Sequence, residues 1–343
     1  MTADGDEFEM PPPRATPRLF GHAEAERALL DGYRSGRMPH AWLICGPRGI
    51  GKATLAYRAA RFVLAHPDAA APAVQAASSL AIDPDHAVAR RVAAQGQNDL
   101  LVLERTVGDR GKLRQDIAAD DVRRSVGFFG SSAGAGGWRI AIVDSVDELN
   151  AAGANALLKI LEEPPERALL LLVSHAPGRI LATIRSRCRV LNLRPLAPAD
   201  VARAAAHVLE REPTDAEIVE AAELAEGSVA RALGMLQGDV LAIRDQVIAL
   251  LDRLPDTDPE ALHALGDSIA GTDPQPLEAF RDSIEGWLSA RLRKGTLAPS
   301  QMDRLAETWQ QIGRATAEAE IFNLDRKPLV FSIFGHLADA ARG

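Results

Sequence analysis

Residues Ala41 to Lys52 read AWLICGPRGIGK, and this stretch decides the fold. The apolar run Ala41 to Cys45 predicts a strand that is buried on both faces. The glycine-rich turn Gly46 to Gly51 comes next, and the spacing of apolar residues from Lys52 to Leu64 predicts a helix. A strand, a phosphate-binding turn and a helix in this order indicate a nucleotide-binding α/β domain.

The same alternation continues on both sides of this unit. Helices are predicted over Glu24 to Tyr33, Asp120 to Phe128 and Asn155 to Glu163, and strands over Leu100 to Leu103, Arg139 to Val143 and Leu169 to Val173. Pro164-Pro165 ends the last of these helices, because proline cannot donate to the helix ladder. Strands that alternate with helices predict a parallel sheet covered on both faces, here over residues 18–194.

After Pro195 the pattern changes to alanine- and leucine-rich helical spacing, broken near Gly227, Gly238 and the Pro255 to Pro259 loop. This pattern predicts a helical bundle over the last third of the chain. Residues 1–17 are acidic and then proline-rich, and predict a flexible tail without the features of a signal peptide. The sequence does not predict the fold of the 66–98 insertion.

Composition excludes several classes of protein. The 343 residues are 47% hydrophobic without a long uncharged apolar run, so no membrane span is expected. Only Cys45 and Cys188 are present, far apart, which favours a reducing, cytoplasmic setting and argues against a disulfide framework or a structural zinc site. A net charge of −8 restricts any nucleic-acid contact to a local surface.

The turn after the first strand has most of the elements that bind phosphate. Backbone N–H groups and a helix N-terminus hold the oxygens, lysine reaches the outer phosphates, and the next Ser or Thr binds magnesium. Gly46, Gly49, Gly51 and Lys52 supply the first elements. Ala53 stands at the magnesium position, and Thr54 is rotated by about 100° around the helix. Bound ATP or ADP without hydrolysis and a ligand-free turn both remain open.

At residue 145, just past the end of a predicted strand, a second group that catalysis needs is missing. Asp144 stands where phosphate-loop ATPases keep an aspartate that faces magnesium, although it could also cap a turn. Ser145 stands where a carboxylate is expected, and Asp147 and Glu148 come too late along the chain to replace it. Two missing groups together predict that this chain has lost ATP hydrolysis.

An arginine-rich stretch follows the last predicted strand. Between residues 179 and 194 the arginines are Arg179, Arg185, Arg187, Arg189 and Arg194, and no acidic residue is present. An arginine delivered to a neighbouring subunit can stabilise charge on transferring phosphate oxygens. The alternative is a solvated surface or one that contacts DNA phosphates.

One motif is set aside. Gly130 to Gly134 matches the G-x-S-x-G pattern of serine hydrolases, but a nucleophile elbow follows a strand and precedes a helix. Here the order is reversed, so no hydrolase is predicted.

These segments together resemble the clamp-loader branch of the AAA+ ATPases, and specifically bacterial DNA polymerase III clamp-loader subunits, over essentially the whole chain. The resemblance rests on Pro39 to Leu43, Gly46 to Thr54, Val143 to Asn150, Asn155 to Pro165 and Ser186-Arg187-Cys188. Gly227 to Arg231 resembles the second sensor of that family, and Phe322 to Lys327 fits its collar domain. The resemblance thus implies a small helical lid over residues 195–238 and an all-α collar domain over 239–343.

The resemblance implies a heteropentamer with the motor subunits tau/gamma and with delta, which opens a sliding clamp and places it on primer–template DNA. The incomplete site favours the stator that closes one end of the ring. Arg187, with Ser186 and Cys188, would then serve a neighbour's ATP site, Ser174 would be the first sensor, and Arg231 would face a γ-phosphate. Many relatives carry a four-cysteine zinc module after the loop helix, and this chain has no cysteine there.

Three rival functions make different predictions. A motor subunit of the tau/gamma kind would turn over ATP in a way that depends on Lys52. A stand-alone phosphate-loop kinase would act as a monomer and leaves the helical last third unexplained. A plain DNA-binding module has poor support from the acidic composition. Polymerase chemistry is not expected, because no pair of metal-binding carboxylates stands in a suitable context.

Overall fold

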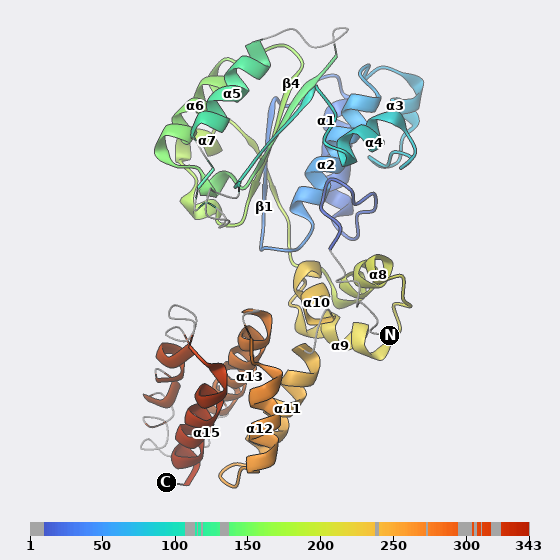
Figure 1. Ribbon diagram of the computed structural model, residues 1–343. Coiled ribbons are helices and arrows are strands. Elements are labelled where there is room, and N and C mark those ends of the chain that lie inside the picture. Colours follow the sequence, from blue (N-terminus) through green and yellow to red (C-terminus); the bar gives the residue numbers. More distant parts are fainter. Residues whose placement is uncertain are drawn as a thin grey trace, which may run out of the picture. The chain divides into compact units, whose positions relative to one another are not determined.

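The structure is a computed structural model that describes residues 10–106, 114, 116–117, 119–130, 137–236, 240–271, 274–293, 304, 307–309, 311–316 and 324–342. The chain forms two compact units, Met1–Ala232 and Leu233–Gly343. Figure 1 shows a sheet between helices in the first unit and helices in the second. The predicted fold class, an α/β domain with a parallel sheet followed by helical parts, is confirmed.

The sheet of the first unit has five parallel strands in the order β2-β3-β4-β1-β5. The strands are β1 Ala41–Cys45, β2 Leu100–Glu104, β3 Arg139–Asp144, β4 Ala168–Ser174 and β5 Arg189–Asn192. The sequence predicts the first four, and the structure confirms them. It does not predict β5, because this short edge strand is mostly exposed and has only two apolar residues, Val190 and Leu191.

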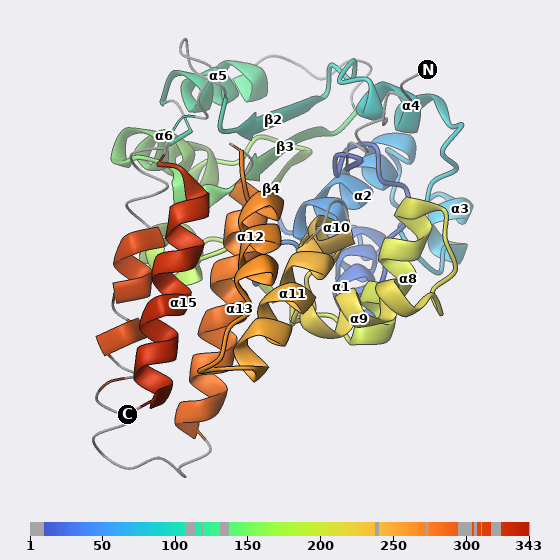
Figure 2. The same cartoon turned by 60° about the horizontal axis from the view of Figure 1, so that its bottom comes forward.

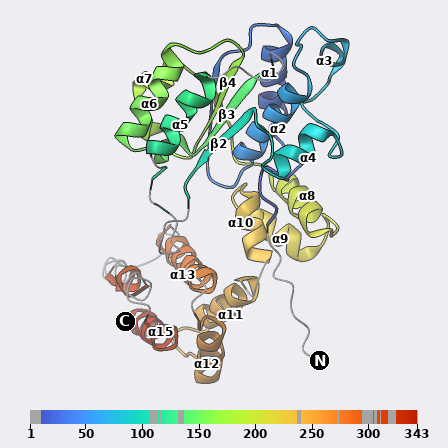
Figure 3. The same ribbon diagram turned by 45° about the horizontal axis from the view of Figure 1, so that its top comes forward.

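Both faces of the sheet are apolar, because successive side chains of each strand point to opposite faces. Trp42 and Ile44 of β1 belong to one cluster of buried side chains, and Leu43 and Cys45 belong to the other. The first face is covered by α1 Ala23–Arg34 and α2 Lys52–Ala65, and the second by α5 Ala119–Gly130, α6 Ala151–Glu162 and α7 Ala182–Arg185 (Figure 3). Burial on both faces explains why these strands read as continuous apolar runs.

Helix α6 begins four residues before the predicted start at Asn155. Asn150 precedes the helix, and its side-chain oxygen accepts a hydrogen bond from the N–H of Gly153 at 2.9 Å. Such a cap satisfies an N–H group that has no partner within the helix.

Residues 66–98, whose fold the sequence leaves open, contain α3 Pro72–Ala76 and α4 Ala87–Ala93. Val74 and Leu80 are buried in the cluster that also contains α1 and α2. From α1, Arg34 Nε donates to the Val74 carbonyl at 3.3 Å, and Glu26 Oε1 accepts from the Leu80 N–H at 2.8 Å. Apolar packing and hydrogen bonds to the backbone therefore hold this insertion.

The predicted tail, residues 1–17, is described from Met10 onward. Arg61 of α2 is buried, and its guanidinium donates to the carbonyls of Arg14 at 3.2 Å and Thr16 at 2.7 Å. This described part of the tail is therefore held against α2.

The helices after the sheet begin with α8 Pro198–Leu209, α9 Ala216–Leu224 and α10 Val229–Leu236. Gly227 joins α9 to α10 at φ +81°, where a Cβ would lie 2.5 Å from the backbone nitrogen of Leu196. The first compact unit continues to Ala232, so these helices up to that residue belong to the same unit as the sheet. The predicted boundaries of lid and collar stay predictions.

The second unit is built from α11 Val240–Asp252, α12 Pro259–Ser268, α13 Pro274–Arg293 and α15 Arg326–Arg342, among other described residues. Figure 2 shows these helices side by side, and Phe280 and Phe334 are fully buried in their common core. Phe322 and Asn323 of the predicted collar motif lie outside the described residues. No described helix combines the length and the apolar character needed to cross a membrane.

The rejected hydrolase motif falls partly outside the described residues, at 131–134. Helix α5 ends at Gly130 and β3 begins at Arg139, so the stretch follows a helix and precedes a strand, as the sequence predicts.

Candidate functional site

The residues singled out by the sequence lie at two opposite edges of the sheet. Because the strands are parallel, their carboxyl ends meet at one edge, the carboxyl edge, and their amino ends meet at the other, the amino edge. Gly46 follows β1, Asp144 ends β3 and Ser174 ends β4, so these three lie at the carboxyl edge. Arg187 precedes β5 by two residues and lies at the amino edge.

The register of β1 and β5 gives the distance between these edges. Trp42 pairs with Arg189, and Cys45 pairs with Asn192. At ~3.3 Å per residue, the length of β1 separates the two edges by about 13 Å. Arg187 is therefore remote from the glycine-rich loop of its own chain.

The loop between β1 and α2 has a backbone conformation that glycine adopts readily. The φ angles are +153° at Gly46, +75° at Gly49 and +99° at Gly51. A Cβ at Gly49 would lie 2.1 Å from Ser228 Oγ, and the Ala230 N–H donates to the Gly49 carbonyl at 3.3 Å. The residues at the start of α10 thus contact the loop and hold its backbone in place.

Lys52 supplies a buried positive charge at the N-terminus of α2. Its side chain is 3% exposed, and its ammonium donates to the carbonyl of Pro47 within the loop. Burial lowers the pKa of Lys52 to about 8, while the nearby Asp144 carboxylate acts in the opposite direction. A helix N-terminus with a buried ammonium suits an anion such as a phosphate group.

The carboxyl edge has fewer groups that could bind magnesium or activate water than an active phosphate-loop hydrolase has. Burial raises the pKa of Asp144, whose Oδ1 accepts a hydrogen bond from the buried Ser145 hydroxyl at 3.2 Å. Ala53 carries no hydroxyl, and Thr54 is half-buried one residue further along α2, about 100° around the helix. The loop therefore fits phosphate oxygens, but these positions lack the hydroxyl and the second carboxylate of an active hydrolase.

The two acidic residues that follow have other partners. Asp147 Oδ1 accepts the backbone N–H of His175 at 2.9 Å. Glu148 pairs with Arg48 of the loop at 3.0 Å and with Arg105 at 2.7 Å. These contacts tie the loop and the end of β4 to the η2 turn Val146–Glu148, a role that the sequence did not predict.

Two buried polar atoms lie at the end of β4. Ser174 Oγ and His175 Nδ1 are buried, and no hydrogen-bond partner for either atom is found in the described part of the chain. Burial, followed by the charge of Lys52, lowers the pKa of His175 to about 4, so its ring is neutral at pH 7. The sequence predicts a role for Ser174 but misses His175, whose only signal is its place directly after a buried strand.

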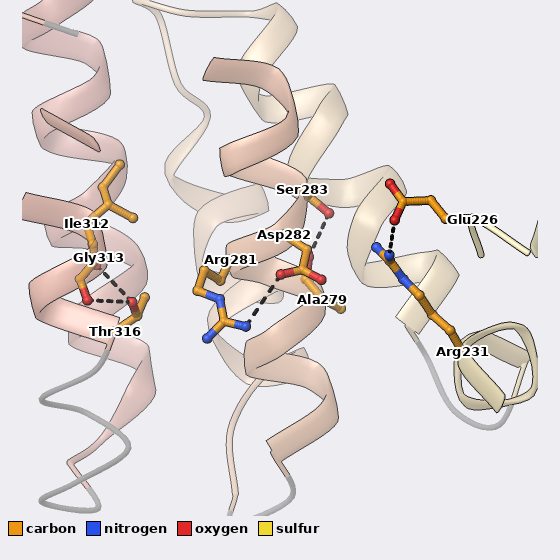
Figure 4. A network of polar contacts seen from close by, with 9 residues as sticks. All are labelled: Glu226, Arg231, Ala279, Arg281, Asp282, Ser283, Ile312, Gly313 and Thr316. Atoms are coloured by element: carbon orange, nitrogen blue, oxygen red, sulfur yellow. Dashed lines mark hydrogen bonds and ion pairs between the residues drawn. The ribbon is translucent and has the colours of Figure 1, made fainter. Parts of the chain in front are cut away.

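Arg231 lies on α10, one residue after the Ala230 that contacts the loop. Its guanidinium pairs with the carboxylate of Glu226 at 3.1 Å, as Figure 4 shows. Its side chain is 41% exposed. The predicted contact of Arg231 with a γ-phosphate stays a prediction.

At the amino edge, Arg187 follows the short helix α7 and makes two contacts within its own chain. Its Nη2 pairs with Glu162 Oε1 at 2.8 Å, and its Nη1 donates to the Thr183 carbonyl at 2.9 Å. The side chain remains 35% exposed. The sequence predicts Arg187 but does not predict Glu162 as its partner.

The neighbours of Arg187 have structural contacts. Ser186 Oγ donates to the Thr183 carbonyl at 3.2 Å. Cys188 packs against the second core cluster, and burial raises the pKa of its thiol to about 12. The Arg189 guanidinium lies 4.9 Å from the centroid of the Trp42 ring, so this arginine of the basic stretch stacks on the domain itself.

Comparison with known proteins relates the sequence of this chain to one family. Residues 21–197 match the family described as "DNA polymerase III, delta subunit". The chain is 38% identical over 149 residues to DNA polymerase III subunit delta' of Pseudomonas aeruginosa. These 149 residues make up 43% of this chain and 41% of that protein. It is 32% identical over 234 residues to subunit delta' of Escherichia coli, covering 67% of this chain and 64% of that protein.

A relative with another name is also similar. DNA polymerase III subunit tau/gamma of Haemophilus influenzae is 29% identical over 245 residues, which cover 70% of this chain and 32% of that protein. The chain thus spans less than two thirds of the length of each of these relatives.

Proposed function

Because the chain belongs to the DNA polymerase III delta-subunit family, whose relatives are clamp-loader subunits, we propose that it is the delta prime stator of a clamp loader. In this proposal it joins tau/gamma and delta subunits in a ring that places a sliding clamp on primer–template DNA. It does not hydrolyse ATP itself. Arg187 acts as an arginine finger on the ATP bound by an adjacent motor subunit.

One observation carries the proposal: Arg187 lies at the amino edge, whereas the phosphate loop of the same chain lies at the carboxyl edge. The two edges are about 13 Å apart along the strands, so Arg187 is placed to face away from the loop of its own chain. Its partial exposure supports contact with another chain. A planar fork of donors suits the oxygens of a phosphate under transfer.

The carboxyl edge supports a stator more than a motor. Ala53 lacks the hydroxyl that binds magnesium in phosphate-loop ATPases, and Ser145 lacks the carboxylate that positions the attacking water. The similarity to a tau/gamma subunit keeps the motor as the second candidate. A motor predicts ATP turnover by the purified chain with magnesium, lost on Lys52→Ala, whereas the stator predicts no turnover in either protein.

We also infer that the loop retains an anion site. Lys52 is buried at the N-terminus of α2, and the buried Ser174 hydroxyl is available at the end of β4. A nucleoside diphosphate or triphosphate would be held there without hydrolysis.

The decisive experiment reconstitutes the complex with Arg187→Ala and follows ATP hydrolysis in a single turnover started by clamp and primed DNA. Loss of an arginine finger costs about 10³-fold or more in rate at the site concerned. Arg185→Ala removes an exposed arginine of the same stretch and is the matched control, with an expected change below about twofold. Wild-type hydrolysis at every site with Arg187→Ala would overturn the arginine-finger proposal.

A further inference from the structure

The partner of Arg187 comes from the end of a rigid helix. Helix α6 ends at Glu162, and the residues before it, Ile160 and Leu161, are buried in the second core cluster. Pro164 prevents the helix from continuing. The Glu162 carboxylate is therefore carried by a fixed part of the domain, next to α7.

The two contacts of Arg187 use only part of its guanidinium. The group has five N–H donors in a fixed plane. One on Nη2 goes to Glu162 and one on Nη1 goes to the Thr183 carbonyl, so three of the five have no acceptor within the described part of the chain. The contacts fix the plane of the fork while leaving donors for phosphate oxygens.

A long arginine side chain loses rotamer freedom when it docks on a target, and this loss opposes docking. An intramolecular carboxylate that already holds the guanidinium removes part of that cost before the subunits meet. On a solvated surface such a pair contributes little to stability. In an interface that excludes water the same contact becomes stronger, because the local dielectric constant falls.

We propose that Glu162 is the positioning residue for Arg187 and holds its guanidinium in the orientation in which it meets the phosphates of a neighbouring subunit. This inference rests on the proposed function, since it needs Arg187 to act in trans. Glu162 itself touches no phosphate. Its effect passes through Arg187 alone.

The chain offers a matched control. Glu163 is the next residue, is exposed, and also carries a carboxylate, but it is Glu162 that pairs with Arg187. Glu162→Gln and Glu163→Gln therefore remove the same charge from adjacent positions, and only the first removes the ion pair.

The test uses the reconstituted complex carrying Glu162→Gln, Glu163→Gln, Arg187→Ala or Glu162→Gln with Arg187→Ala. We expect Glu162→Gln to lower the single-turnover hydrolysis rate about tenfold, because the arginine side chain then rotates more freely. This loss of rate is smaller than the loss caused by removing the arginine. The ATP concentration at half-maximal rate, the melting temperature of the chain and the assembly of the complex should not change. Glu163→Gln should hydrolyse ATP at the wild-type rate.

The double variant separates a positioning role from a structural one. If Glu162 acts through Arg187, then Glu162→Gln should slow the reaction no further once Arg187 is alanine. A further loss in the double variant would overturn the inference, because Glu162 would then act elsewhere. A Glu162→Gln complex that is faster than wild type would also overturn it, because the carboxylate would then restrain the arginine.

The two proposals fail in different ways. Wild-type hydrolysis with Glu162→Gln, together with a slow Arg187→Ala complex, would sink the positioning role and leave the arginine finger standing. Wild-type hydrolysis with Arg187→Ala would remove the premise of both.

Discussion

The carboxyl edge and the amino edge of the sheet differ in the functional groups that they carry. The carboxyl edge has loop glycines at positive φ and a buried Lys52, whereas Ala53 carries no hydroxyl and Ser145 no carboxylate. The amino edge keeps an arginine and its carboxylate partner on a surface that is still partly exposed. The comparison teaches that contacts within the chain can hold a glycine-rich loop in shape whether or not the groups needed for hydrolysis stand beside it.

Packing explains why the loop geometry persists. Gly49 lies against Ser228, the residue before α10, and accepts a hydrogen bond from Ala230 of that helix, while Glu148 pairs with Arg48 of the loop. A change in the loop therefore disturbs the fold whether or not a ligand binds. At the amino edge, the described residues hold the Arg187 guanidinium through two contacts, with Glu162 and with the Thr183 carbonyl.

The largest expected effect tests this constraint at the carboxyl edge. Gly49→Ala adds a Cβ 2.1 Å from Ser228 Oγ at φ +75°, and should lower the free energy of unfolding by about 2–4 kcal/mol. Gly178→Ala is the control at an exposed turn, where a Cβ meets no atom within 4 Å, and should change it by less than about 0.5 kcal/mol. Equal melting temperatures for Gly49→Ala and wild type, measured without ligand, would break the comparison.

A series of binding measurements at different pH values tests whether Lys52 binds an anion. Burial holds its pKa near 8, and an anion prefers the protonated ammonium, so affinity should fall as pH rises through that value. Calorimetry with ADP in the absence of magnesium should show about tenfold weaker binding at pH 9 than at pH 7, which equals ~1.4 kcal/mol. Lys52→Ala should bind weakly with little dependence on pH. A constant affinity in the wild type across this range would contradict the assignment.

The smallest effect concerns the buried hydroxyl of Ser174. Because its Oγ is fully buried and has no partner among the described atoms, Ser174→Ala should leave the ligand-free chain unchanged or stabilise it by up to about 1 kcal/mol. The rise in melting temperature caused by ADP should become smaller. Ser186→Ala, at the amino edge, should not alter that rise. A ligand-free Ser174→Ala chain that melts well below wild type would show that the hydroxyl has a structural partner.

Much of the fold could be predicted from local pattern. The strand at Ala41–Cys45 has the predicted bounds, because burial on both faces makes every one of its residues apolar. Strand β5 could not be predicted, since an exposed edge strand has no apolar period and Arg189 is polar. The start of α6 was placed too late, because an Asn150 cap is a weak signal in an alanine-rich stretch.

The candidate site was predictable as a set of positions and not as a set of contacts. The loop glycines, Lys52 and Arg187 follow from spacing and from family resemblance. The contacts of Glu148 with Arg48 and of Glu162 with Arg187 join residues 100 and 25 positions apart, and no local pattern encodes such pairs. For the same reason, the sequence did not predict that His175 lies within electrostatic range of Lys52.

By itself the sequence determined the strand–loop–helix unit, the alternation that makes a parallel sheet, and the absence of a hydroxyl at Ala53 and of a carboxylate at Ser145. These depend on residue type and local spacing, which the chain carries directly. Only the tertiary structure decided that Arg187 and the loop lie at opposite edges, because strand order and register arise from packing between distant segments. It also decided that Glu162 meets Arg187, since a contact between a helix end and a turn exists only once both have packed on the sheet.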